Sequence, residues 1–119
     1  MSCFNKFYKK EKLLSRTLEI DEKLYCELEK LSKEVYDASI NKLVNAAIEE
    51  IIEKENITLY NRKNTSYVAR TFLIRNSVWE NLYELKEKYA ISIRLIVNTA
   101  IRNVLIEEGI IKEDELNKR

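Results

Sequence analysis

The apolar residues of this chain follow two different periods, and both periods occur twice. Residues 17–20 and 71–74 alternate between polar and apolar side chains, which is the pattern of a strand with one buried face. Apolar residues then recur every three or four positions, which predicts an amphipathic helix after each strand. The two helical stripes are Leu24, Leu28, Leu31 and Val35, and Val78, Leu82, Leu85 and Tyr89. Asp21 and the pair Asn76-Ser77 offer side-chain acceptors that can cap the helix starts.

A second, more apolar helix is predicted after each of these, over residues 39–54 and 92–107. Breaks at 36–38 and 90–91 end the first helices, and Ser39 and Ser92 are placed as N-caps of the second ones. Their wide apolar faces indicate helices that pack against several partners. The faces consist of Ile40, Leu43, Val44, Ala47, Ile48, Ile51 and Ile52, and of Ile93, Ile96, Val97, Ala100, Ile101, Val104 and Leu105.

The two sets of elements are copies of one unit. The segment from Arg16 to Ile20 returns as Arg70 to Ile74, 54 positions later, and the start of the second helix returns after 53 positions. The residues that recur unchanged in that helix are Ser39, Ile40, Val44, Asn45, Ala47 and Ile48, as Ser92, Ile93, Val97, Asn98, Ala100 and Ile101. A unit of this size cannot bury its apolar face alone, so the two copies need each other.

Each short strand also needs a partner, because its backbone donors and acceptors would otherwise stay unpaired. We therefore predict that segments 15–21 and 69–75 pair antiparallel within one chain, about a centre near Thr17 and Thr71. The expected fold is mainly α, with a two-stranded antiparallel ribbon over four helices. The alternative is a plain helical bundle in which residues 15–21 form a loop.

This strand-helix-helix order, with a serine before the second helix, resembles the ribbon-helix-helix family of DNA-binding regulators. The resemblance covers residues 13–54 and 67–107. In that family two chains usually form the ribbon together, so the duplication looks like such a dimer fused into one chain, similar to tandem regulators of archaeal viruses. It implies a ribbon-helix-helix pseudo-dimer. The expected organisation is a basic arm (1–14), a first unit (15–54), a linker (55–66), a second unit (67–107) and a tail (108–119), with both units in one folded domain.

The resemblance also implies a DNA interface. The family's ribbon enters the major groove, and its second helix points its N-terminus at a phosphate. Carried onto this chain, the base-reading positions are Ser15, Thr17, Glu19, Ala69, Thr71 and Leu73. The phosphate anchors are Ser39, Ile40 and Asn41, and Ser92, Ile93 and Arg94. Glu19 could accept a hydrogen bond from cytosine N4, and Leu73 or Ala69 could touch a thymine methyl group; the alternative is that one strand has degenerated and reads little.

Two positions depart from the family pattern. The family usually has a glycine two residues before the anchoring serine, and this chain has Asp37 and Ala90 there. Aspartate tolerates a left-handed conformation moderately and alanine poorly, so we expect the second turn to be reshaped.

Charge is concentrated near the predicted strands. The net charge of +1 argues against a protein that coats nucleic acid, but residues 1–16 hold five basic side chains against the single acid Glu11, and residues 59–79 hold four and no acid. Further candidates for phosphate contact are Lys9, Lys10, Lys12, Arg16, Arg70 and Arg75. The arm has two other interpretations: a disordered tail, or a segment whose aromatic residues Phe4, Phe7 and Tyr8 pack on the domain or on a partner.

The composition disfavours other classes of protein. The chain has no histidine, its two cysteines (Cys3 and Cys26) lack metal-ligand spacing, and its carboxylates follow helix surfaces, so we expect no enzyme activity, no metal and no cofactor. No apolar run reaches the length of a membrane span and no cleavable signal pattern opens the chain, so we expect no membrane partner and a cytoplasmic location, in the host if the source is a virus.

The leading hypothesis is a sequence-specific double-stranded DNA-binding transcriptional regulator, a repressor, with at most weak homo-oligomers that form on DNA. The alternative is an antitoxin-like or adaptor protein that acts mainly through protein–protein contacts, with residues 110–116 as a partner-binding segment.

Overall fold

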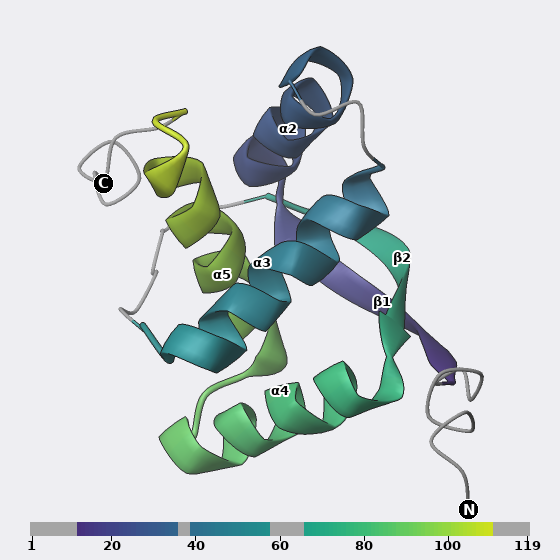
Figure 1. The fold of residues 1–119 in the computed structure, drawn as a ribbon, viewed down its shortest axis with the longest axis vertical. Coiled ribbons are helices and arrows are strands. Elements are labelled where there is room, and N and C mark those ends of the chain that lie inside the picture. Colours follow the sequence, from purple (N-terminus) through teal and green to yellow (C-terminus); the bar gives the residue numbers. More distant parts are fainter. Residues whose placement is uncertain (1–11, 36–38, 58–65, 111–119) are drawn as a thin grey trace, which may run out of the picture.

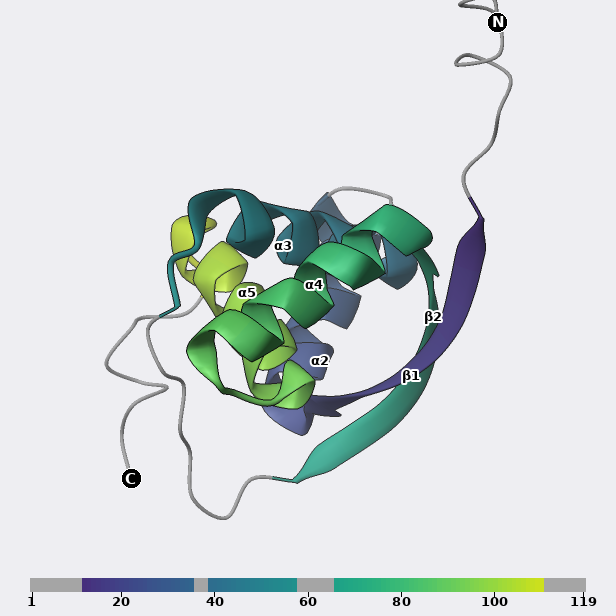
Figure 2. The same ribbon diagram turned by 90° about the horizontal axis from the view of Figure 1, so that it is seen from below.

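The structure is a computed structural model, and it describes residues 12–35, 39–57 and 66–110. The chain order is β1 (Leu13–Asp21), α2 (Glu22–Lys30), the π-helical turn η1 (Leu31–Val35), α3 (Ile40–Lys54), β2 (Tyr67–Arg75), α4 (Asn76–Tyr89) and α5 (Ile93–Glu107). Figure 1 shows these elements in sequence colours. In Figure 2 the two strands form a ribbon along one side of the molecule, and the helices lie on its concave side. The architecture is therefore mainly helical, with a two-stranded antiparallel sheet and four helices.

The ribbon pairs the first copy of the repeat with the second. Thr17 lies opposite Thr71 at its centre, with the two hydroxyl oxygens 2.9 Å apart, and Leu13 and Asp21 lie opposite Arg75 and Tyr67 at its ends. Antiparallel pairing within one chain and its centre are thus confirmed, and the plain helical bundle is excluded.

Backbone hydrogen bonds also join the copies beyond the ribbon. Asn76 N–H donates to the carbonyl oxygen of Lys12 at 3.0 Å, and Glu22 N–H donates to that of Ser66 at 2.9 Å. The first N–H group of α2 and of α4 therefore donates to the residue that directly precedes the other copy's strand.

The strands are longer than the alternating segments predicted. Each spans nine residues, and Leu13 and Leu14, which the sequence assigned to the basic arm, belong to β1. Pairing explains the extension, because every residue added to a ladder satisfies backbone groups that would otherwise depend on water. The presence of a partner strand therefore decides where each strand ends more than the order of polar and apolar side chains does.

Three of the predicted helix caps are confirmed and one is wrong. Asp21 Oδ1 accepts from Lys23 N–H at 2.9 Å, Ser39 Oγ from Lys42 N–H at 3.2 Å, and Ser92 Oγ from Leu95 N–H at 3.1 Å. The exception is α4, which begins at Asn76 itself and has Arg75 as its N-cap, without a side-chain cap bond. The reason is that each strand runs directly into its helix, so the cap is the last strand residue, and Arg75 has no acceptor where its repeat counterpart Asp21 has one.

The core lies between the ribbon and the helices. Leu18, Ile20, Phe72 and Ile74 supply the inner face of the ribbon, and α3 and α5 pack against each other behind it. The other buried apolar residues are Leu24, Leu28, Leu31, Val44, Ala47, Ile48, Ile51, Val78, Leu82, Leu85, Ile96, Val97, Ala100, Ile101 and Leu105. Among the stripe residues whose burial the structure describes, Tyr89 lies outside the core: it is 39% exposed, and its hydroxyl group donates to Glu55 Oε1 at 2.8 Å.

The turn between α4 and α5 contradicts the expectation that alanine would force a different shape. Ala90 adopts the left-handed conformation, with φ +53°, and its N–H donates to the carbonyl oxygen of Lys86. Ile91 N–H reaches the same oxygen at 3.2 Å, so the end of α4 holds the turn in place. The corresponding residue of the first copy, Asp37, lies outside the described residues.

Candidate nucleic-acid interface

The six predicted base-reading side chains lie together on the outer face of the ribbon. Ser15, Thr17, Glu19, Ala69, Thr71 and Leu73 are all exposed, and they form the cross-strand pairs Ser15–Leu73, Thr17–Thr71 and Glu19–Ala69. They alternate along each strand with the core residues, as a period of two requires. Sequence reasoning missed Leu13 and Tyr67, which continue the same alternation two positions further and are 53% and 37% exposed.

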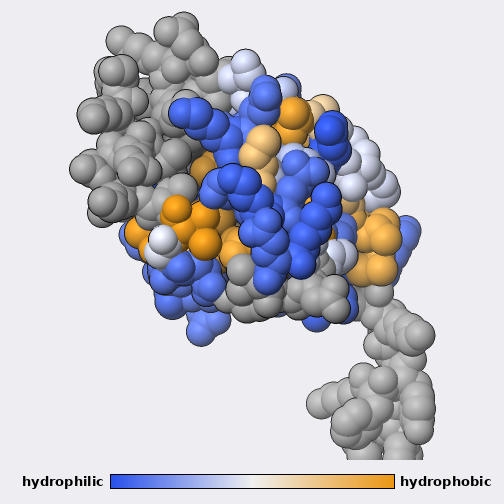
Figure 3. Space-filling view, turned by 90° about the horizontal axis from the view of Figure 1, so that it is seen from above, coloured by the Kyte–Doolittle hydropathy of each residue, from blue (hydrophilic) through white to orange (hydrophobic). Residues whose placement is uncertain are grey.

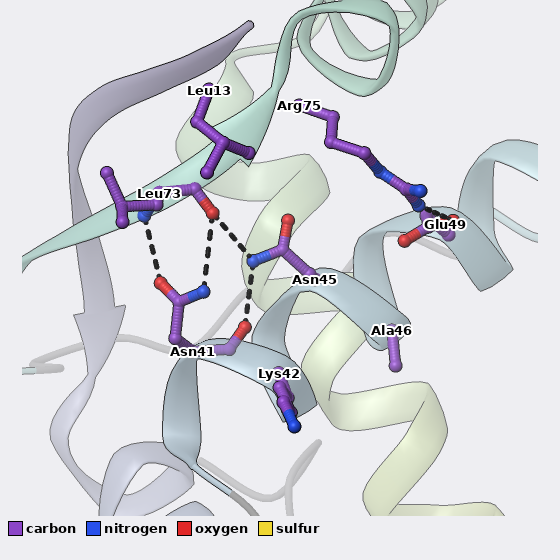
Figure 4. Close-up of a pocket in the computed structure, with 8 residues that line it drawn as sticks. All are labelled: Leu13, Asn41, Lys42, Asn45, Ala46, Glu49, Leu73 and Arg75. Atoms are coloured by element: carbon purple, nitrogen blue, oxygen red, sulfur yellow. Dashed lines mark hydrogen bonds and ion pairs between the residues drawn. The ribbon is translucent and has the colours of Figure 1, made fainter. Parts of the chain in front are cut away.

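The start of α3 is held against the outer edge of β2. The side chain of Asn41 makes two bonds to the backbone of Leu73: its Oδ1 accepts from the N–H at 2.9 Å and its Nδ2 donates to the carbonyl oxygen at 3.3 Å. Asn45 Nδ2 donates to the same carbonyl oxygen at 3.0 Å, and to that of Asn41 at 2.8 Å (Figure 4).

The start of α5 is held against β1 in the corresponding way. Asn98, which is 1% exposed, accepts at Oδ1 from Asp21 N–H at 2.7 Å. Its Nδ2 donates to the carbonyl oxygens of Glu19 at 2.9 Å and Arg94 at 2.8 Å. The identity of Asn45 and Asn98 in the repeat thus has a structural reason: both satisfy backbone groups of the other copy's strand.

These contacts bring the predicted phosphate anchors to the two outer edges of the ribbon. Ser39, Ile40 and Asn41 flank β2, and Ser92, Ile93 and Arg94 flank β1. The first backbone N–H groups of a helix lack partners within it, so they can bind an anionic oxygen. The side chain of Asn41 is bound to Leu73, which leaves its backbone N–H as the candidate donor. Arg94 has its guanidinium 3.4 Å from Glu19 Oε1 and 4.7 Å from the ring centroid of Tyr67.

Arg16 and Arg70 are held by matching aromatic contacts. The guanidinium carbon of Arg16 lies 5.1 Å from the ring centroid of Trp79, and that of Arg70 lies 5.2 Å from the ring centroid of Tyr25. Each ring belongs to the first helix of the other copy. Each guanidinium also donates to the carbonyl oxygen of the preceding residue, at 3.1 Å in Arg16 and 2.9 Å in Arg70. Stacking of this kind orients an arginine without neutralising its charge.

The remaining predicted phosphate contacts are more dispersed. Arg75 forms an ion pair with Glu49 at 2.7 Å, and Lys12 is exposed directly before β1. Lys9 and Lys10 lie outside the described residues. Beside Arg75 an open groove of about 330 Å³ follows the edge of the ribbon (Figure 4). It is lined by Leu13, Asn41, Lys42, Asn45, Ala46, Glu49, Leu73 and Arg75.

The shifted pKa values lie away from this face. Hydrogen bonds from Lys88 and Tyr89 lower the pKa of Glu55, and the bond to Glu55 raises the pKa values of Lys88 and Tyr89. A hydrogen bond to Glu50 raises the pKa of Lys54. All four residues are on α3, α4 or the turn after α3.

Other kinds of site find little support among the described residues. In these ranges no group of three or more His, Cys, Asp or Glu side chains could hold a metal ion, and Cys26 is an exposed free thiol. Within the same ranges no single helix is long and apolar enough to cross a membrane; α4 and α5 meet that test only as a pair, and they are bent by 106°. Comparison with known proteins finds no matching family model, no matching curated protein and no matching solved structure.

Proposed function

We propose that this protein is a sequence-specific double-stranded DNA-binding regulator that acts as a repressor by occupying its operator. The observation that carries the proposal is the outer face of the ribbon, where six exposed side chains stand in register around the Thr17–Thr71 pair. In this proposal the chain is a ribbon-helix-helix pseudo-dimer, and the ribbon enters the major groove. A two-stranded ribbon fits that groove and can reach base edges with its outward side chains.

The surroundings of the ribbon support the same function. Phosphate contacts fix a protein's register on DNA, and base contacts supply its specificity. The starts of α3 and α5 flank opposite edges of the ribbon through Asn41, Asn45 and Asn98, so both helix N-termini can meet a phosphate while the ribbon is in the groove.

The distribution of charge supports it too. Arg16, Arg70 and Arg75 are all strand residues, and Lys12 precedes β1, whereas the net charge of the whole chain is only +1. A local basic surface beside a base-reading element suits a protein that binds one defined site more than one that coats DNA.

The test is a titration of labelled duplex DNA, recovered from a random library, at several salt concentrations. Arg70→Ala should weaken binding to all duplexes alike and reduce the slope of log affinity against log salt by about one. Thr71→Ala should change the preferred bases and leave the slope unchanged.

The matched control is Lys54→Ala, because Lys54 ends α3 and the opposite end of that helix contacts the ribbon. It removes one charge and should leave both affinity and slope near those of the wild type. If Arg70→Ala changes base preference but not the slope, the roles of the two strand residues are exchanged.

The competing proposal is an antitoxin-like or adaptor protein. Most of its candidate partner segment, residues 110–116, lies outside the described residues. Viewed from the end where α2 lies, hydrophobic side chains stand in separate small groups among hydrophilic ones (Figure 3). A wild-type chain without salt-dependent retention on duplex DNA or heparin would favour this second function over the first.

A further inference from the structure

The backbone of the ribbon is nearly symmetric about the Thr17–Thr71 pair, but its outer face is not. On one side of that pair lie Ser15 and Leu73, and on the other lie Glu19 and Ala69. Glu19 and Leu73 are repeat counterparts, as are Ser15 and Ala69, because each pair is 54 positions apart. Duplication alone would give both halves the same side chains. In this chain the side chains differ, so the two halves offer different chemistry at equivalent places.

The difference continues to both ends of the ribbon. At the end with Leu73, the next outward pair is Leu13 and Arg75, and the two leucines are 53% and 50% exposed. At the end with Glu19, the Asp21 side chain is buried and caps α2, so Tyr67, which is 37% exposed, alone continues the outer face beyond Glu19 and Ala69. One end of the outer face is therefore aliphatic with a cation, and the other is acidic with an aromatic ring.

The starts of α3 and α5 also differ, next to the strand residues that differ. The Asn41 side chain bonds to the backbone of Leu73 and not to its side chain, so the leucine side chain remains available on the outer face. Its counterpart at the start of α5 is Arg94, whose guanidinium lies 3.4 Å from the carboxylate of Glu19 and over Tyr67. A strand that had lost its role in reading DNA would not need a cation beside its carboxylate. The Glu19 and Arg94 side chains remain 56% and 51% exposed, and an exposed ion pair of this length is weak, so the carboxylate can exchange it for another donor.

We propose, on the basis of the DNA-binding function above, that this chain recognises a directional, non-palindromic operator. Aliphatic side chains favour the thymine methyl group, so Leu73 selects thymine in one half-site. A carboxylate is repelled by phosphate but accepts a hydrogen bond from the amino group of cytosine, so Glu19 selects cytosine in the other. Arg94 then neutralises the carboxylate or turns to the adjacent phosphate. A twofold-symmetric dimer reads a palindrome, and a chain with two different halves is free of that constraint.

The experiment is a selection from random duplexes with three full-length proteins. The wild type is compared with a Ser15→Ala/Glu19→Leu variant and an Ala69→Ser/Leu73→Glu variant. The first variant gives β1 the alanine and leucine of β2, and the second gives β2 the serine and glutamate of β1, so in each variant both strands carry the same side chains next to the central threonine pair. All four positions are exposed and each new side chain already occurs at the equivalent place, so both variants should fold, which a thermal melt by circular dichroism checks.

We expect a non-palindromic motif from the wild type. The first variant should yield a palindrome built from the thymine-containing half, and the second a palindrome built from the cytosine-containing half. Glu19→Leu alone should reduce the preference for cytosine about tenfold, whereas Arg94→Ala should lower affinity without changing the preferred base.

Three results would overturn the inference. A palindromic wild-type motif, or a motif specified in only one half, would show that the two halves do not read different bases, while DNA binding itself would stand. No enrichment of any duplex by the wild type would remove the proposed function and this inference with it.

Discussion

Replacing Ala90 with glycine should stabilise the protein, although the substitution removes a side-chain carbon. Ala90 ends α4 at φ +53°, where an L-residue brings its Cβ atom too close to the backbone carbonyl oxygen. The residue is exposed, so its methyl group contributes little buried area that the change could lose.

The expected gain follows from two opposing terms. The left-handed conformation costs an L-residue about 1–2 kcal/mol, and glycine is free of that cost. Glycine also gives the unfolded chain more conformations, which takes back about 0.4–1 kcal/mol. The net gain in the free energy of unfolding is about 1 kcal/mol, which for a chain of this size raises the melting temperature by about 4 °C.

Urea denaturation followed by circular dichroism measures the difference, and Ala46→Gly is the matched control. Ala46 is also exposed but lies inside α3, where glycine costs about 1 kcal/mol relative to alanine. The two substitutions should therefore move the urea midpoint in opposite directions. If Ala90→Gly lowers the midpoint as Ala46→Gly does, the turn is not under the strain inferred here.

Three further predictions concern the core, the polar contact behind the ribbon and pH. Ile48→Asp should unfold the domain, because Ile48 is fully buried and an unpaired charge there costs several kcal/mol; a cooperative melt close to that of the wild type would contradict this. Asn98→Ala should lower the free energy of unfolding by about 2 kcal/mol, measured in urea, since it leaves Asp21 N–H and the Glu19 carbonyl oxygen without their partner. Glu55→Gln should lower the melting temperature at pH 7. Bonds from Lys88 and Tyr89 lower the folded-state pKa of Glu55, so its contribution is present above its ordinary pKa of 4.5 and is lost as the pH falls through the lower folded-state pKa; a difference between the two proteins that did not shrink as the pH fell from 7 to 3 would argue against this origin.

Periodicity predicted those parts of the fold that depend on which side of an element is buried. The alternation in residues 17–20 and 71–74 assigned Leu18, Ile20, Phe72 and Ile74 to one face and Thr17, Glu19, Thr71 and Leu73 to the other, and the family resemblance added Ser15 and Ala69 to the outer set. Serines before apolar helical runs predicted the caps of α3 and α5, because that acceptor acts within one turn of its own chain.

Other features depend on segments that are far apart in the sequence, and the sequence did not reveal them. The bonds of Asn41 to Leu73 and the stacking of Arg16 on Trp79 join residues of different copies, so no local pattern marks them. The missing cap of α4 was hidden for a different reason: Asn76 and Ser77 have suitable side chains, but the strand extends to Arg75 and leaves neither of them outside the helix. The bond of Tyr89 to Glu55 likewise joins the end of α4 to the end of another helix.

The covalent link between β1 and β2 has a consequence for how the protein meets its target in a cell. A ribbon made by two separate chains exists only above the concentration at which they associate, so at very low copy number the binding surface is lost by dissociation. Here the second strand belongs to the same chain as the first, so the two cannot separate by dilution. The complete ribbon is therefore present in every folded molecule, and binding should depend on the first power of protein concentration down to a few molecules per cell.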